Sequence, residues 1–240
     1  MKKLIIMAAA ISLVSCKKDS TTSADTSAQN TVVTTDNSVS PISENDSERV
    51  NPDELITKLS SQQKVESSVL ENLLPAEVDG LKKTNIPSGS LPGSVTGASY
   101  VDMSGASAGN MKMYNLGIID GAGSEANAKQ VANVLKQYYG ISTELTAEEK
   151  AQLEEAKKNL DPAMVTEMEK AMKDAKHSST NTLINGMPSV VGSTEMRGMK
   201  GNSVTSVYKN RYLITAMGLG GSSEEVLKQA IEKMDLSSLP

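Results

Sequence analysis

The only cysteine of this 240-residue chain, Cys16, is the feature that most restricts how the chain can fold. A single cysteine allows no disulfide within the chain, so the folded part must be stabilised by an apolar core. Cys16 closes an apolar run, residues 4–15, that follows Lys2 and Lys3. The run is too short to cross a bilayer core of about 30 Å, and its basic flank is typical of a secretion signal. We therefore expect residues 1–15 to be a signal peptide.

The end of this signal, Leu13-Val14-Ser15-Cys16, resembles the lipobox of bacterial lipoproteins. The resemblance implies that the Cys16 thiol carries a diacylglycerol, that cleavage occurs before it, and that a further acyl chain such as palmitate caps the new N-terminus. Two or three acyl chains anchor a protein stably, whereas one binds reversibly. Lys17-Lys18-Asp19 is similar to the start of Bacteroidetes-type lipoproteins. This implies a cell-envelope protein at the outer membrane, with the periplasmic and the surface face both open.

The segment after the cysteine is rich in Ser, Thr, Asp and Asn up to Val50. Such a composition cannot bury enough apolar surface to offset the entropy of ordering. We predict that residues 16–50 are a lipidated, disordered tether with a mean reach of roughly 30 Å, and that residues 51–240 are one domain. The net charge of −5 and the absence of a basic stripe argue against nucleic acid as a partner.

The pattern of the remaining residues predicts an α+β fold, in which an antiparallel sheet has helices packed on one face. Asn51-Pro52 is a helix-start signal, and Lys209-Asn210-Arg211 is a turn in which Asn tolerates positive φ. The closing strand, Gly-rich turn and helix after Tyr212 resemble the end of PsbP/Mog1-like domains, which implies the same class of fold. The expected strands cover 80–86, 95–103, 111–120, 187–194, 202–208 and 212–219, and the later helices begin at 125 and 224.

Residues 146–176 are predicted to form a charged helical hairpin inserted between the main elements. Thr146–Glu149 is a capping box, and Asp161-Pro162 starts a second helix that we expect to end near Lys176. This second helix carries methionines that share one face, and we predict a partner-binding surface there. A soft-metal site for Cu(I) is the alternative. The methionines are Met164, Met168 and Met172.

Two short motifs could carry chemistry. Residues 105–109 match the G-x-S-x-G pattern of hydrolases around Ser107, but residues 110–114 look like a strand where a helix should follow. The one histidine, His177, is expected at the end of a charged helix and cannot by itself form a zinc site, so we predict no metal. Residues 121–126 fit a dinucleotide fingerprint without the second parallel strand that it requires. We interpret them as a turn before a helix and predict no cofactor.

Together these patterns favour a non-enzymatic lipoprotein that tethers one α+β domain to an envelope membrane and acts there as a binding or scaffolding module. A serine hydrolase using Ser107 and a Cu(I) binder using the methionines are the alternatives. The hydrolase hypothesis would need a base near Ser107, and the metal hypothesis would need methionine sulfurs that converge in space.

Overall fold

The structure is a computed structural model, and it describes residues 50–85, 95–102, 104, 112–141, 154, 161, 165–166, 170, 175–196, 199–220 and 222–240. Cys16, Ser107 and the methionines of the predicted hairpin lie outside these residues, as does nearly all of the hairpin itself. The helices are α2 (Pro52–Ser60), α3 (Ser67–Asn72), α4 (Glu125–Tyr138), α7 (Glu224–Glu232) and the 3₁₀ turn η4 (Leu236–Ser238). The strands are β1 (Glu77–Val78), β2 (Leu81–Lys82), β3 (Thr84–Asn85), β4 (Val95–Asp102), β5 (Lys112–Asp120), β6 (Lys176–Ile184), β7 (Met187–Met196), β8 (Met199–Tyr208) and β9 (Tyr212–Leu219).

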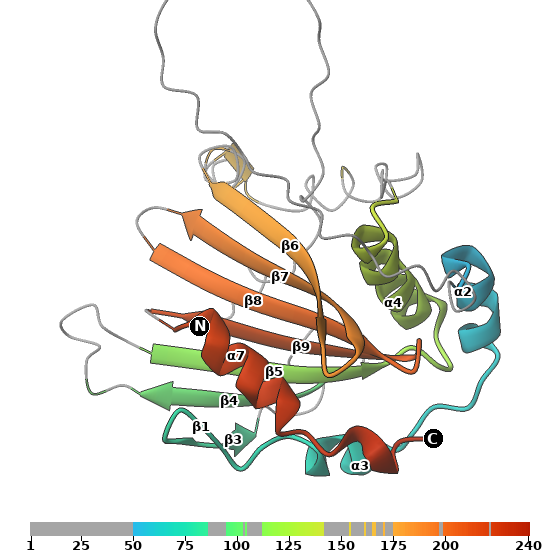
Figure 1. Ribbon diagram of the computed structural model, residues 1–240, viewed down its shortest axis with the longest axis horizontal. Helices are drawn as coiled ribbons and strands as arrows, with labels where there is room; N and C mark the ends of the chain where they lie inside the picture. The colour runs from blue at the N-terminus through green and yellow to red at the C-terminus, as the bar shows by residue number, and fades with distance from the viewer. Residues whose placement is uncertain are drawn as a thin grey trace, which may run out of the picture. The chain divides into compact units, whose positions relative to one another are not determined.

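The main sheet of the described residues is antiparallel and has seven strands in the order β3-β4-β5-β9-β8-β7-β6 (Figure 1). The expected α+β class and the β4–β5 hairpin are therefore confirmed. β5 and β9 are central neighbours, although the β5 residue Gly117 and the β9 residue Thr215 are 98 positions apart in sequence. This pairing joins the two halves of the chain into one sheet.

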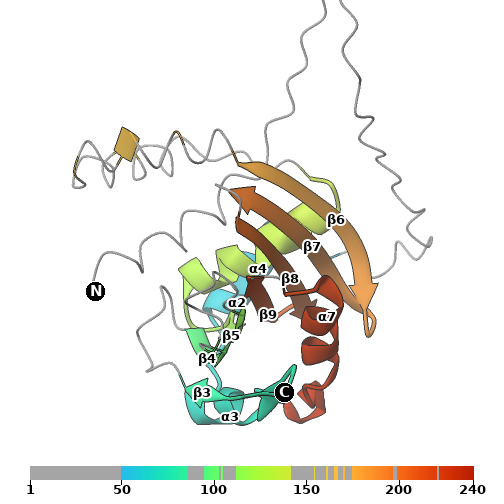
Figure 2. The ribbon, with the colours of Figure 1, turned by 90° about the vertical axis from the view of Figure 1, so that its left-hand side faces the viewer.

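The helices cover both faces of the sheet, and the expectation that they occupy one face is wrong. Successive side chains of a strand point to opposite faces. In β5, Ile118 packs in the cluster that contains Leu227 of α7, whereas its neighbour Ile119 packs in the cluster that contains Val131 of α4. Figure 2 shows α7 and α4 on opposite sides of the curved sheet. We call these the α7 face and the α4 face.

The strand β6 was not predicted, because the helical hairpin was expected to continue to Lys176. Its side chains are exposed from Lys176 to Asn181 and only Ile184 is buried, so the strand lacks the apolar alternation that marks a half-buried strand. The turn after it is the missed signal. Asn185 and Gly186 both have positive φ (49° and 75°), as a two-residue hairpin turn requires.

Asparagine and serine side chains cap the starts of α2, α4 and α7. Asn51 caps α2 by accepting from the Asp53 N–H, and Ser124 caps α4 by accepting from the Asn127 N–H. The cap of α7 is Ser223, whose side chain accepts from the Val226 N–H. Ser222 is buried, and its Oγ has no hydrogen-bond partner among the described residues.

Tyrosines are the largest fully buried side chains of the core. Tyr100, Tyr114 and Tyr212 are at most 1% exposed. The Tyr100 hydroxyl donates to the Pro75 carbonyl at 2.6 Å, and burial raises the pKa of Tyr100 to about 12. Tyrosine thus supplies the large aromatic side chains of the core in a chain without Phe or Trp. The methionines buried in the described core are Met187 and Met234.

Candidate functional site

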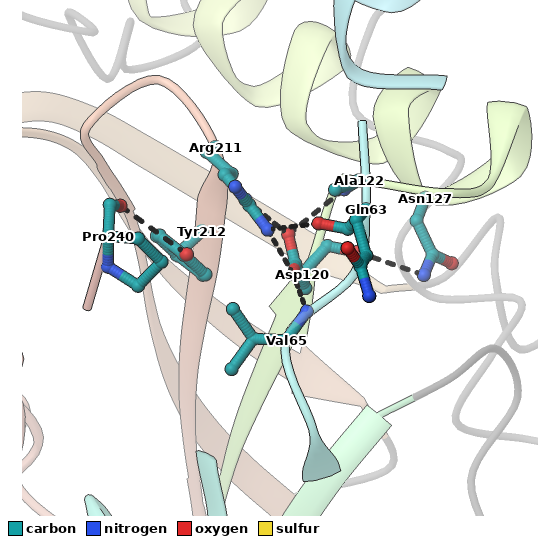
Figure 3. Close-up of polar contacts among 8 residues, drawn as sticks. All are labelled: Gln63, Val65, Asp120, Ala122, Asn127, Arg211, Tyr212 and Pro240. Atoms are coloured by element: carbon teal, nitrogen blue, oxygen red, sulfur yellow. Dashed lines mark hydrogen bonds and ion pairs between the residues drawn. The ribbon is translucent and has the colours of Figure 1, made fainter. Parts of the chain in front are cut away.

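The most densely bonded polar cluster lies where β5 ends and β9 begins (Figure 3). Arg211, in the turn before β9, makes two parallel bonds to the Asp120 carboxylate, Nε to Oδ1 and Nη2 to Oδ2, each 2.8 Å long. Asp120 is 2% exposed and Arg211 is 15% exposed. A guanidinium and a carboxylate fit each other in this two-point geometry, which makes the pair strong and directional.

Backbone groups also bond to this pair. The Asp120 carboxylate also accepts from the N–H groups of Val65 (2.8 Å) and Ala122 (3.0 Å), and Arg211 donates a further bond to the Gln63 carbonyl (2.8 Å). Burial by itself would raise the pKa of Asp120, but the hydrogen bonds from Arg211 and the two N–H groups lower it below the usual value. Each oxygen of the carboxylate thus accepts two bonds, and the bonds to Val65 and Gln63 fasten the α2–α3 connection to the sheet.

A polar groove lies on the α7 face, at the end of the sheet where β6 and β8 begin and β7 ends. It encloses about 350 Å³ and is bounded on one side by Ser222, just before α7. Each of the three strands contributes alternate side chains to it, because these point to the same face. The polar side chains that the strands direct to this face are Lys176, Ser178, Ser193, Glu195, Lys200 and Asn202.

The charges of this groove are not paired with one another. Glu195 of β7 lies opposite Lys176 of β6 on one side and Lys200 of β8 on the other. Even so, within the described part of the chain none of the three forms an ion pair, since no nitrogen–oxygen distance falls within 4.0 Å. Two ammonium groups and one carboxylate are therefore open to a bound molecule.

Neutral groups form the next row of the groove. Ser178 Oγ and Ser193 Oγ are 2.8 Å apart, and the Asn202 amide donates to the Ser222 carbonyl at 2.7 Å. Each serine hydroxyl keeps unused acceptor capacity, so this row can bond to hydroxyl or amide groups of a ligand. Sequence reasoning missed the groove because its residues are brought together by strand register, which no local pattern reports.

A second hollow, of about 500 Å³, lies between the end of α2 and the start of α4. Its lining includes Ile56, Ser60 and Glu125. The Glu125 carboxylate is bonded to Lys129 at 2.9 Å. This hollow therefore offers a ligand fewer open charges than the groove.

His177 is in β6, and its expected place at the end of a helix is wrong. Its Nδ1 lies 3.1 Å from the Thr194 hydroxyl, across the β6–β7 ladder. β6 is four strand positions from β5, the strand that follows Ser107 in sequence. At about 4.8 Å per position, the two strands are roughly 19 Å apart across the sheet.

The glycine-rich stretch before α4 forms a turn that leads into a capped helix, as interpreted from the sequence. Gly123 has φ of +69°, and the N–H of Ala122 bonds to Asp120. β5 pairs with β9 in antiparallel fashion, so the parallel unit of a dinucleotide site is not formed there.

The described ranges contain neither a metal-binding cluster nor a membrane-spanning helix. No group of three or more His, Cys, Asp or Glu side chains in them could hold a metal ion. No described helix combines the length and the apolar character needed to cross a bilayer.

Comparison with known proteins yields little for this chain. No family model matches it, and no curated protein matches it. A crystal structure of a protein of unknown function from Pseudomonas aeruginosa is similar over 63% of this chain and 94% of that chain, with 15% identity and a TM-score of 0.29. A likeness at this level supports no inference about function.

Proposed function

We propose that this chain is a lipid-anchored protein of the bacterial envelope whose domain is a binding module without catalytic activity. The anchor rests on the lipobox-like sequence that ends at Cys16. The domain begins with α2 at Pro52, so the intervening residues act as the tether. The hydrolase and Cu(I) alternatives depend on Ser107 and on methionines outside the described residues, and they stay predictions.

The observation that carries the binding role is the groove on the α7 face with its three open charges. Lys176 and Lys200 suit the carboxylate of a ligand, and Glu195 between them suits an ammonium group. The serine and asparagine row suits an amide. A small zwitterionic molecule such as a short peptide combines these groups, and it is the ligand class that we assign to the groove.

The anchor is tested by replacing Cys16 with serine, which cannot form the thioether. We expect the Cys16→Ser chain to lose lipid labelling and to move from the membrane fraction to soluble or unprocessed fractions. A variant that stays lipid-labelled in the membrane would refute the proposed attachment site. The unmodified chain is the matched control.

The groove is tested by titrating the purified chain with dialanine, a neutral dipeptide, while the thermal transition is recorded. Dialanine should raise the transition temperature in a saturable way. Acetate and methylammonium, tested separately, should raise it less, because each carries only one of the two charges of the dipeptide. Lys200→Gln and Glu195→Gln should abolish it, whereas Lys58→Gln on α2 should not. Equal responses of all three variants would rule out the groove.

A further inference from the structure

The outermost strand β6 has a free edge in the described structure. It pairs with β7 along its whole length and is last in the strand order, with no described strand beyond it (Figure 2). Its outward backbone N–H and C=O groups can therefore accept another strand. The opposite edge is β3, which has two residues, whereas β6 has nine.

Natural sheets usually protect a long edge, and β6 has little of this protection. Prolines, inward charges, bulges and short strands are the common devices. The β6–β7 ladder is in continuous register from Lys176 to Ile184 without a bulge, and the strand contains no proline. Lys176 at one end is its one lysine. Asn181 holds the strand in place by donating to the last carbonyls of α4, those of Gln137 and Tyr138.

We propose that β6 pairs with β6 of a second copy of this chain, antiparallel, about a two-fold axis at its central residue, Thr180. In this register Thr180 lies opposite itself, Ser178 opposite Thr182, and Lys176 opposite Ile184. Hydroxyl pairs of this kind are favourable across antiparallel strands, and no like charges meet. The two Lys176 side chains end about 27 Å apart, well beyond the screening length of about 8 Å.

The exposed apolar side chains on the α4 face of this edge support a strand partner. Leu183 is 60% exposed, and Ile141, which follows α4, is 43% exposed. In the proposed register Leu183 lies opposite His177 of the second copy, so the imidazole covers part of it. A symmetric pair also uses both β6 edges at once, so neither is left open to a further copy.

The test uses the full chain with Cys16→Ser, so that an introduced cysteine is the only one. Thr180→Cys places two thiols at the axis, where opposite Cα atoms are about 4.5–5.5 Å apart and a disulfide can form. We expect rapid covalent dimerisation under mild oxidation. Lys176→Cys is the matched control. It lies on the same strand, but the two introduced thiols would be far apart in the dimer, so it should crosslink at least tenfold more slowly.

A second variant checks the pairing without oxidation. Thr180→Lys puts like charges opposite each other at the axis, and it should convert a dimer to a monomer in sedimentation equilibrium at micromolar concentration. Thr180 is exposed, so the thermal transition of the monomer should persist. Equal crosslinking rates for the two cysteine variants, or a parent chain that is monomeric in the same sedimentation experiment, would overturn the proposal.

Discussion

The replacement Asp120→Asn tests how strongly the buried pair with Arg211 stabilises the domain. Asparagine keeps the size of the side chain but removes the charge. Its NH₂ group would face N–H groups that now donate to the Asp120 carboxylate. Removing one partner of a buried ion pair costs about 3–5 kcal/mol. We expect the lower end, about 3 kcal/mol, because Arg211 is 15% exposed and water can reach part of the guanidinium once it is unpaired.

Chemical denaturation of the parent and of Asp120→Asn measures this difference in the free energy of unfolding. The temperature of the thermal transition should fall by about 6–12 °C for a domain of this size. The matched control is Asp53→Asn, which breaks the pair between Asp53 and Lys136 (2.8 Å). Asp53 is 75% exposed, and such surface pairs contribute less than about 1 kcal/mol. A loss for Asp120→Asn within roughly 0.5 kcal/mol of the control, the error of additive comparisons, would refute the reasoning.

The Asp120–Arg211 pair also makes the stability of the domain depend on pH. The pKa of Asp120 is lower in the folded than in the unfolded chain, so the unfolded chain binds a proton first. The stabilisation is therefore fully present above the usual carboxyl pKa of 3.8 and is lost as pH falls through the lower, folded pKa. The free energy of unfolding of the parent should decline over this acid range more steeply than that of Asp120→Asn. Parallel curves would contradict the pKa shift.

Three further predictions concern packing and chain organisation. Gly218→Ala should destabilise the domain by about 1–3 kcal/mol in chemical denaturation, because the added Cβ would lie 2.5 Å from Ser222 Cβ, and adding Ser222→Gly should recover part of the loss. Limited proteolysis should cut first within residues 17–50 and leave a fragment that starts near Asn51, whereas early cuts within residues 95–116 would show that the core is misplaced. Replacing residues 146–174 with a short Gly/Ser loop should leave the thermal transition in place and remove crosslinks to partners, and an unfolded product would show that this segment belongs to the core.

Local sequence signals predicted the helices whose first residues cap them through side-chain hydrogen bonds. Asn51-Pro52 and Ser124 start helices because their side chains bond to nearby N–H groups, which needs no knowledge of the rest of the fold. The β4–β5 hairpin was found for a similar reason, since its strands are adjacent in sequence. The strand β6 was missed because an exposed edge strand buries little and shows no apolar period.

The two-faced packing and the candidate groove depend on information that is spread along the chain. In β5, Leu116, Ile118 and Ile119 are all buried, and such a continuous apolar run is a signal of burial on both faces that the one-face expectation overlooked. The groove could not be found in this way. Lys176, Glu195 and Lys200 become neighbours only through the register of three strands, and each by itself is an ordinary surface charge.

The pairing of β5 with β9 makes completion of the sheet depend on the last strand of the chain. The centre of the sheet needs contacts between residues separated by 98 positions, as between Gly117 and Thr215, so the first half of the chain cannot complete its core alone. Contacts of such long range slow folding, because the intervening chain must be closed into a loop first. The seven-stranded sheet therefore cannot be completed until β9, its last strand in sequence, is available.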